Sequence, residues 1–176
     1  MIFKKGQAAM EFLMTYGWAI LVVLIAIGAL AYFGVLNPGR FLPSACVISN
    51  QLGCEEFRVT SGASGTIDII IRNGRGVNIQ GDPATPTTEL NLIVKTNIGG
   101  TEYTCDDAGT TITTLNDGVA QKYTYGVGEC LSGTASPTSF GITGAKFKGE
   151  LSLSYGDAGS TLGVRTATGT INTKIE

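Results

Sequence analysis

The stretch KKGQAAMEFLMTYGWAILVVLIAIGALAYFGVL, residues 4–36, decides how this chain is built. It opens with two lysines and contains a single acid, Glu11, after which no charged residue occurs up to its end. An uninterrupted apolar run predicts a helix that is surrounded on every side by lipid or by similar helices. Asn-Pro-Gly at residues 37–39 ends the run, because proline disfavours helix at the residue before it.

The predicted helix is long enough to cross a membrane. Residues 18–36 alone would span about 28 Å, close to the thickness of the bilayer hydrocarbon core. Residues 7–36 would form a helix about 45 Å long. Lys4 and Lys5 flank the short end, so the positive-inside rule predicts a cytoplasmic N-terminus and a head on the other side of the membrane.

The segment around the first glycine resembles the archaeal class III signal peptide, which is found on type IV pilin-like subunits. That family has the motif Gln-x-Ser-x-Glu-Phe after a basic residue and a glycine. The matching residues here are Lys5, Gly6, Gln7, Glu11 and Phe12. The chain departs from the motif at position 9, where alanine replaces the usual serine. The resemblance covers residues 1–36.

The resemblance implies that a prepilin peptidase cleaves the chain after Gly6, with Lys5, Gly6 and Gln7 as the processing residues. Residues 1–6 would then be the signal peptide. Residues 7–36 would stay in the mature protein, first as a transmembrane helix and later as part of a filament core.

The resemblance also implies a role in assembly for the acid. In the family, the acid at the fifth mature position pairs with the free N-terminal amine of a neighbouring subunit. Here Glu11 would meet the amine of Gln7, which exists only after cleavage. The implied assembly residues are Gln7, Glu11 and Phe12. On helix physics alone, Glu11 is an ordinary solvated acid that the helix dipole stabilises.

Four cysteines follow the helix, and the chain contains no histidine. Their spacings do not match paired CxxC zinc motifs. Four cysteines allow three pairings, among which we expect Cys46–Cys54 and Cys105–Cys130 because each closes a modest local loop. Four buried free thiols are the alternative interpretation. Disulfides would place the head outside the cytoplasm.

The whole chain predicts an α+β fold, in which the long N-terminal hydrophobic helix precedes an all-β head with an immunoglobulin-like β-sandwich. We assign residues 37–54 to a linker and the first disulfide loop, and residues 55–176 to the head. A hairpin is expected around an Asn-Asp-Gly turn. The expected strands are 66–72, 89–95, 111–115, 120–125, 146–155 and 164–175.

The composition argues against several classes of function. A net charge of −2 does not suit a nucleic-acid-binding surface, which is normally basic. The commonest general base, histidine, is missing, and neither a GxSxG elbow nor a GxGxxG loop occurs. A solvated turn is favoured over a calcium site for Asp106 and Asp107. We therefore expect no enzymatic activity, no cofactor and no metal.

The leading hypothesis is a structural subunit of an archaeal type IV-like pilus that serves adhesion or surface attachment. Its partners would be identical subunits, the prepilin peptidase, the assembly machinery and, before assembly, the membrane. We expect the precursor in the cell membrane and the assembled protein at the cell surface. The alternatives are a single-pass membrane anchor that displays a β-sandwich binding module, and a minor pilin or archaellum-related subunit.

Overall fold

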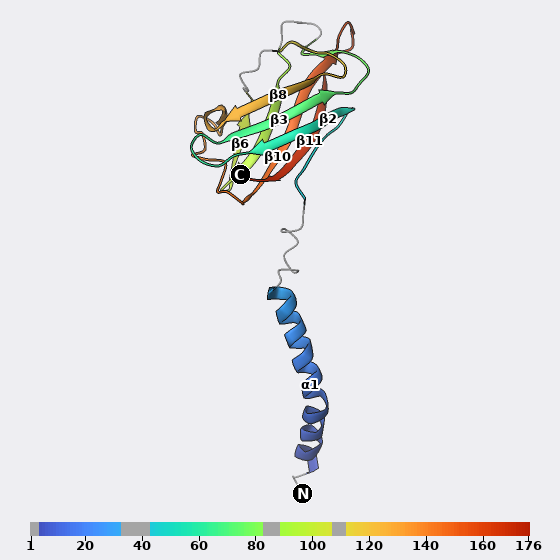
Figure 1. Cartoon of the computed structure of the whole chain (residues 1–176), viewed down its shortest axis with the longest axis vertical. Helices are drawn as coiled ribbons and strands as arrows, with labels where there is room; N and C mark the ends of the chain where they lie inside the picture. Colours follow the sequence, from blue (N-terminus) through green and yellow to red (C-terminus); the bar gives the residue numbers. More distant parts are fainter. Residues whose placement is uncertain (1–3, 33–42, 83–88, 107–111) are drawn as a thin grey trace. The chain divides into compact units, whose positions relative to one another are not determined.

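The computed structural model describes residues 4–32, 43–82, 89–106 and 112–176, and only the backbone of residues 4–8 (Figure 1). The chain divides into two compact units, Met1–Pro43 and Ser44–Glu176. We call the first unit the helix and the second unit the head, and describe each by itself.

The helix α1 comprises Lys4–Tyr32. Within the described residues the helix already includes Lys4, ahead of the predicted Gln7, because lysine favours helix and no proline interrupts this segment. Residues 33–36, where the sequence predicts the end of the helix, lie outside the described residues.

The head is built from antiparallel strands in two sheets, one of eight strands and one of three. The strands of the larger sheet are β1 (Ala45–Ile48), β4 (Ile79–Gln80), β5 (Leu92–Ile98), β6 (Thr101–Cys105), β7 (Thr114–Leu115), β9 (Cys130–Leu131), β10 (Lys146–Asp157) and β11 (Arg165–Lys174). The strands of the smaller sheet are β2 (Leu52–Val59), β3 (Thr66–Asn73) and β8 (Ala120–Gly126).

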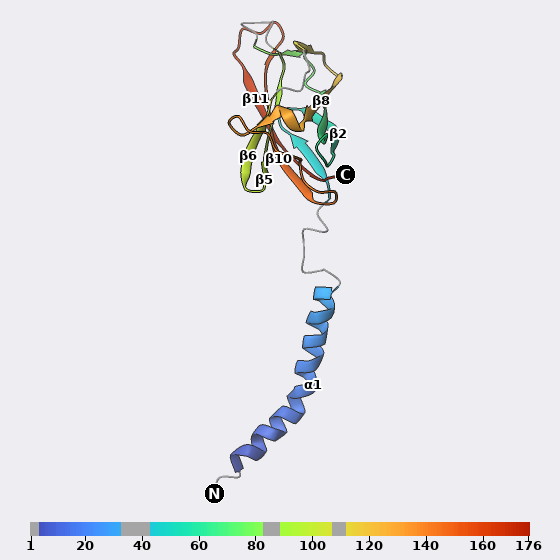
Figure 2. The ribbon, with the colours of Figure 1, turned by 90° about the vertical axis from the view of Figure 1, so that its left-hand side faces the viewer.

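The large sheet has the order β1-β11-β10-β5-β6-β9, and β4 joins it beside β10 and carries β7. The small sheet has the order β2-β3-β8. Figure 2 shows the two layers from the side. The predicted α+β class is confirmed. The division into eight and three strands differs from the four-and-three division of an immunoglobulin constant domain, so the immunoglobulin-like part of the prediction is not confirmed.

The core lies between the sheets and follows from alternation along the strands. In β10 the inward residues Phe147, Leu151, Leu153 and Tyr155 are buried, whereas the lysines and glutamate between them are exposed. The inward residues of both sheets form one hydrophobic cluster. Each fully buried large aliphatic side chain contributes about 1.5–3 kcal/mol relative to an exposed one.

Two buried tyrosines tie the layers together. Tyr123 and Tyr125 lie on β8 in the small sheet, and their hydroxyls donate hydrogen bonds to the backbone carbonyls of Leu90 and Leu92. Burial raises the pKa of both phenols well above the usual value, so both stay neutral donors. Each ring therefore fills the core while its polar end is satisfied.

The head begins earlier than the sequence predicted. β1 and the first part of β2 lie within residues 37–54, which the sequence assigned to a linker and a disulfide loop. β1 is short, but it pairs with β11 from Ala45 to Ile48 and so belongs to the sheet. Asn50 and Gln51, both with positive φ, turn the chain from β1 in the large sheet to β2 in the small one.

The predicted hairpin between residues 111–115 and 120–125 is wrong. Residues 116–118 do form a turn, in which Val119 donates its backbone N–H to the carbonyl of Asn116 at 3.2 Å. The strands on either side do not pair with each other, because β7 pairs with β4 and β8 pairs with β3 along its whole length. The turn therefore carries the chain from one sheet to the other.

The two faces of β3 offer a direct test of this packing. Ile69 is fully buried, whereas its neighbour Ile70 lies half-buried on the outer face. Ile69→Ala should lower the free energy of unfolding of the head by about 2–5 kcal/mol, because it leaves a cavity in the core. Ile70→Ala is the matched control and should cost clearly less. Denaturant unfolding of the full chain in detergent measures both; equal losses would contradict the assigned faces.

Candidate functional site: an uncovered apolar helix

The surface of α1 is apolar all round, and the helix taken by itself does not bury it. Its large apolar side chains from Met10 to Tyr32 expose between 46% and 87% of their area. In the head, by contrast, side chains of the same type are buried in one cluster. Exposed apolar area costs about 25 cal/mol per Å² in water. The helix is therefore more stable in an apolar environment than in water.

One helix within the described residues, Ala9–Tyr32, is long and apolar enough to cross a membrane by length and composition. Its 24 residues have a mean hydropathy of 2.3 in the most apolar window. At ~1.5 Å per residue they would span about 36 Å. A signal sequence near an N-terminus has the same features, so this property by itself fits an anchor and a signal equally.

Glu11 is the one acid on the described part of α1, and its side chain is exposed. Among the described side chains, its carboxylate contacts no cation. Its backbone carbonyl accepts a hydrogen bond from the Thr15 hydroxyl at 2.8 Å. One residue later, the ring of Phe12 lies 4.6 Å from that of Tyr16, one turn away.

The structure places all the predicted processing and assembly residues on one continuous helix. Lys5, Gly6 and Gln7 lie in its first turns, although their side chains are outside the described part. Glu11 and Phe12 follow on the same helix. The local backbone is therefore uninterrupted between the expected cleavage position and the acid.

Two glycines leave open positions on the surface of the helix. A Cβ added at Gly17 or at Gly28 would meet nothing within 4 Å. The two positions are about three helical turns apart, which places them on the same side of α1. Small residues in such positions allow another helix to approach closely.

The four cysteines form the two expected disulfides. Cys46–Cys54 joins β1 of the large sheet to β2 of the small sheet, with 5.8 Å between the Cα atoms. Cys105–Cys130 joins two residues that face each other across β6 and β9, and both are fully buried. The first disulfide therefore links the two layers, and the second fixes the edge of the large sheet.

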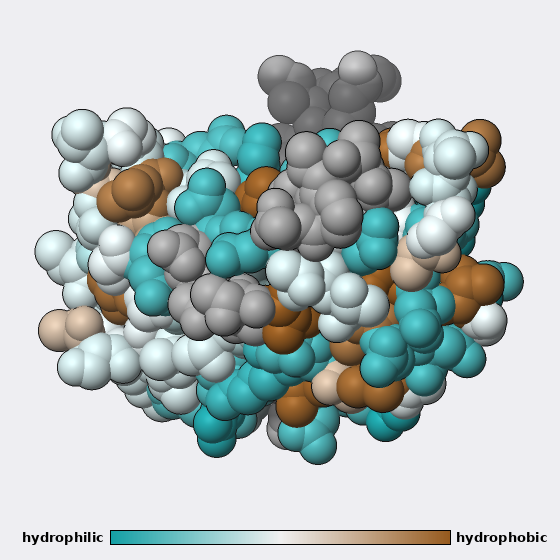
Figure 3. Space-filling view, turned by 90° about the horizontal axis from the view of Figure 1, so that it is seen from above, coloured by the Kyte–Doolittle hydropathy of each residue, from teal (hydrophilic) through white to brown (hydrophobic). Residues whose placement is uncertain are grey.

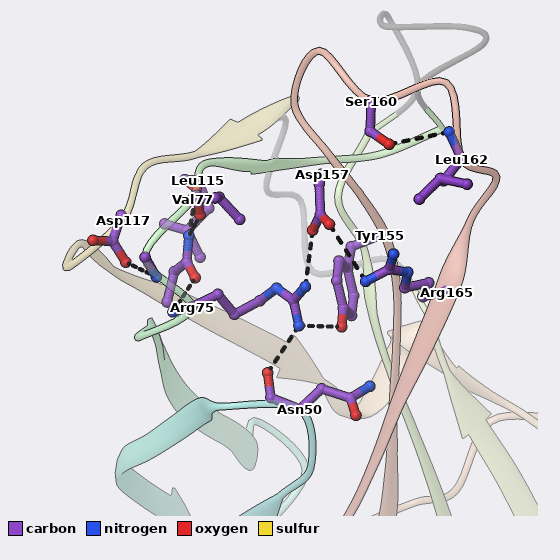
Figure 4. Close-up of polar contacts among 12 residues, drawn as sticks. Asn50, Arg75, Val77, Leu115, Asp117, Tyr155, Asp157, Ser160, Leu162 and Arg165 are labelled. Carbon is purple, nitrogen blue, oxygen red and sulfur yellow. Dashed lines mark hydrogen bonds and ion pairs between the residues drawn. The ribbon is translucent and has the colours of Figure 1, made fainter.

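A polar cluster at the end of the head opposite Ser44 was not predicted from the sequence (Figure 4). The Arg75 guanidinium donates to the Asn50 carbonyl at 3.2 Å, to the Tyr155 hydroxyl at 2.9 Å and to Asp157 Oδ1 at 2.9 Å. Its carbon lies 4.8 Å from the centroid of the Tyr155 ring. Asp157 also pairs with Arg165 at 3.4 Å. Arg75 thus ties the segment after β3 to the turn between β1 and β2 and to the end of β10.

Asn73 supports this cluster from below. Its side chain is fully buried, donates to the carbonyls of Val77 and Leu115 at 2.8 and 3.0 Å, and accepts from the backbone N–H of Arg75 at 3.1 Å. The bonds to Val77 and Arg75 hold the segment that follows β3, and the bond to Leu115 holds β7, which is distant in the sequence. Asn73, which together with Gly74 looks like an ordinary turn in the sequence, is therefore a buried residue that anchors these segments.

The surface at this end of the head is mixed. Figure 3 looks onto the end that carries the turn between β10 and β11, and outside the grey atoms hydrophilic and hydrophobic residues alternate over short distances. The cluster around Arg75 lies beneath these loops as a structural support.

A second polar cluster lies on the outer face of the small sheet. Asp68 on β3 receives a hydrogen bond from the Thr124 hydroxyl at 2.8 Å and pairs with Arg58 and Lys122, both at 3.2 Å. Burial by itself raises the pKa of the Asp68 carboxyl, but the bonds from Thr124, Arg58 and Lys122 outweigh it and hold the pKa below its ordinary value. The cluster ties all three strands of the small sheet.

These clusters hold loops and strands in place. Within the described residues, no group of three or more His, Cys, Asp or Glu side chains is arranged to hold a metal ion. Asp107, half of the pair considered for calcium, lies outside those residues. The feature with the strongest functional implication is thus the uncovered helix.

Comparison with known proteins adds no relative: no family model, no curated protein and no solved structure matches the chain.

The Asp68 cluster predicts a pH dependence of stability. Because the pKa of this carboxyl is depressed in the folded head, its contribution is present above the ordinary value of 3.8 and is lost as the pH falls below it. The free energy of unfolding should therefore fall less steeply with decreasing pH in Asp68→Asn than in the wild type. Glu56→Gln, on the same face but without a cation contact among the described residues, is the control and should keep the wild-type slope. A wild-type slope in Asp68→Asn would contradict the assignment.

Proposed function

We propose that this chain is a structural subunit of an extracellular filament of the archaeal type IV-like pilus kind. The helices pack together as the filament core, and the β heads form its surface and serve attachment. The observation that supports this most is a helix that is apolar on every side, joined to a head that buries a core of its own. Packing among copies gives the helix the apolar surroundings that it needs outside the bilayer.

Further support comes from the order of residues at the N-terminus. A basic residue, Gly6 and Gln7 precede the apolar run, so cleavage between them keeps the helix in the mature chain. The new amine then lies at the same end of the helix as Glu11, the carboxylate without a cation partner among the described side chains. A charge buried among packed helices needs an opposite charge beside it.

The location of the head follows from its chemistry. Two disulfides are typical of proteins outside the cytoplasm. With the lysines on the cytoplasmic flank, the precursor would sit in the membrane with its head outside and reach the cell surface on assembly. A minor pilin or archaellum-related subunit has the same layout and is distinguished by its abundance in the filament.

The alternative function is a single-pass anchor that displays the head as a binding module. The length and hydropathy of Ala9–Tyr32 support this equally well. The two functions differ in the final surroundings of the helix. The helix of an anchor stays in lipid, whereas the helix of a filament subunit leaves the lipid and packs against other helices.

Processing gives the first test. We expect cleavage after Gly6, so that the protein isolated from the cell surface begins at Gln7, and intact-mass measurement checks this directly. Gly6→Val should block cleavage because it enlarges the residue at the scissile bond. Ala9→Ser restores the usual family residue and is the control that should be cleaved at least as well as the wild type. Surface-assembled protein that keeps Met1 would contradict the proposal.

Assembly gives the second test. Glu11→Ala and the isosteric Glu11→Gln should enter the membrane and be cleaved, but should yield few or irregular filaments, because the amine of Gln7 loses its partner. Thr15→Ala is the matched control: it removes the hydrogen bond to the Glu11 carbonyl and leaves the carboxylate unchanged, so filaments should form normally. Electron microscopy and fractionation measure both. Normal filaments from Glu11→Gln would show that the carboxylate has no pairing role.

A further inference from the structure

Four exposed lysines gather on the outer face of the large sheet, in the half nearer Ser44. Lys95 lies on β5, Lys146 and Lys148 on β10, and Lys174 on β11. Among the described residues none of the four forms an ion pair. Lys146 and Lys174 are directly opposite each other across two paired strands, where like charges destabilise a sheet. We call this surface the lysine face.

The lysine face is polar and slightly hollow. A shallow depression of about 580 Å³ is lined by Lys95 and Lys148, by the acids Glu102 and Glu150, and by polar side chains such as Asn172. Two acids on this face, Glu102 and Glu150, are fewer than the lysines, and neither is within ion-pairing distance of a described cation. The face therefore keeps an excess of positive charge that the head itself does not neutralise.

The outer face of the small sheet, on the opposite side of the head, has the reverse balance. Its acids are Glu55, Glu56, Asp68 and Glu176, and its cations are Arg58, Arg72 and Lys122. All three cations are already paired with Asp68 or Glu55.

Glu56 and Glu176 have no cation partner among the described residues. They border a shallow depression of about 620 Å³, together with Phe57 and Ile70. We call this surface the carboxylate face.

From this complementarity we infer that the lysine face of one head packs against the carboxylate face of the next copy of the chain. The inference rests on the proposed filament function and adds the contact between heads. Unpaired cations on one face meet unpaired acids on the other, which fixes the orientation of neighbours. A contact between two different faces of one protein is heterologous, and repeated contacts of this kind build open helical arrays.

The lysine face and the carboxylate face both carry unpaired charges at the same end of the head, which agrees with subunits that stand side by side. Lys146 and Lys174 lie where β11 approaches its end, and Ile175, which follows Lys174, bridges to Val59 at the end of β2. Glu176 donates its backbone N–H to the carbonyl of Val59 at 2.8 Å. The unpaired charges of both faces therefore include residues at the same end of the head, so parallel neighbours present them at one level.

A zero-length carbodiimide cross-linker, which joins lysine to carboxylate directly, tests the contact on assembled full-length protein. The two faces lie on opposite sides of the sandwich, so a bond from Lys148 to Glu56 can form only between two copies. We expect a ladder of cross-linked oligomers whose peptides join Lys95, Lys146, Lys148 or Lys174 to Glu55, Glu56 or Glu176.

Lys148→Glu should reduce these peptides and the yield of filaments, and the double variant Lys148→Glu/Glu56→Lys should recover both. Leu162→Glu, an exposed change in the turn between β10 and β11, is the control and should leave them unchanged.

The outcomes separate the two proposals. Filaments whose cross-links join other surfaces, or in which Lys148→Glu changes nothing, overturn the contact between heads and leave the filament function intact. If the processed protein forms no oligomers at all, the filament function fails and the head contact fails with it.

Discussion

The constraint on which the rest of this protein depends is a long helix whose surface is apolar on every side. From Met10 to Tyr32, large apolar side chains point outward on all sides of α1. Covering each of them contributes on the order of 1.5–3 kcal/mol, so the surroundings of the helix dominate the energetics of the whole molecule. In the function that we propose, lipid covers the helix before assembly and other copies of the helix cover it afterwards. This requirement is the physical basis of the filament function that we propose.

The head solves the opposite problem, because it must be stable when exposed to solvent. It buries one core between two sheets, satisfies the hydroxyls of Tyr123 and Tyr125 across that core, and links the layers through Cys46–Cys54. A disulfide of this kind typically adds about 2–4 kcal/mol. The cluster around Arg75 then fixes the loops at one end. The outer faces of the sandwich carry the charged side chains on which the inferred contact between heads depends.

Local features of the fold were predictable, and features that depend on distant segments were not. The helix follows from an uninterrupted apolar run, and β10 follows from alternation between apolar and polar residues. The disulfide pairing follows from short loops. The hairpin prediction was wrong because a turn at residues 116–118 does not determine with which strands its two flanking strands pair. Likewise, Arg75 meets Asn50, Tyr155 and Asp157 only after the turn between β1 and β2 and the end of β10 come together, and no spacing in the sequence indicates this.

Electron cryo-microscopy of appendages sheared from cells that express the protein tests the central claim most directly. The account predicts filaments in which residues 7–36 of many copies form a packed helical core, with Glu11 beside the amine of Gln7 from a neighbour and the β heads outside. It would be contradicted if the sheared material lacked this chain while the membranes held it as dispersed single copies, each helix surrounded by lipid.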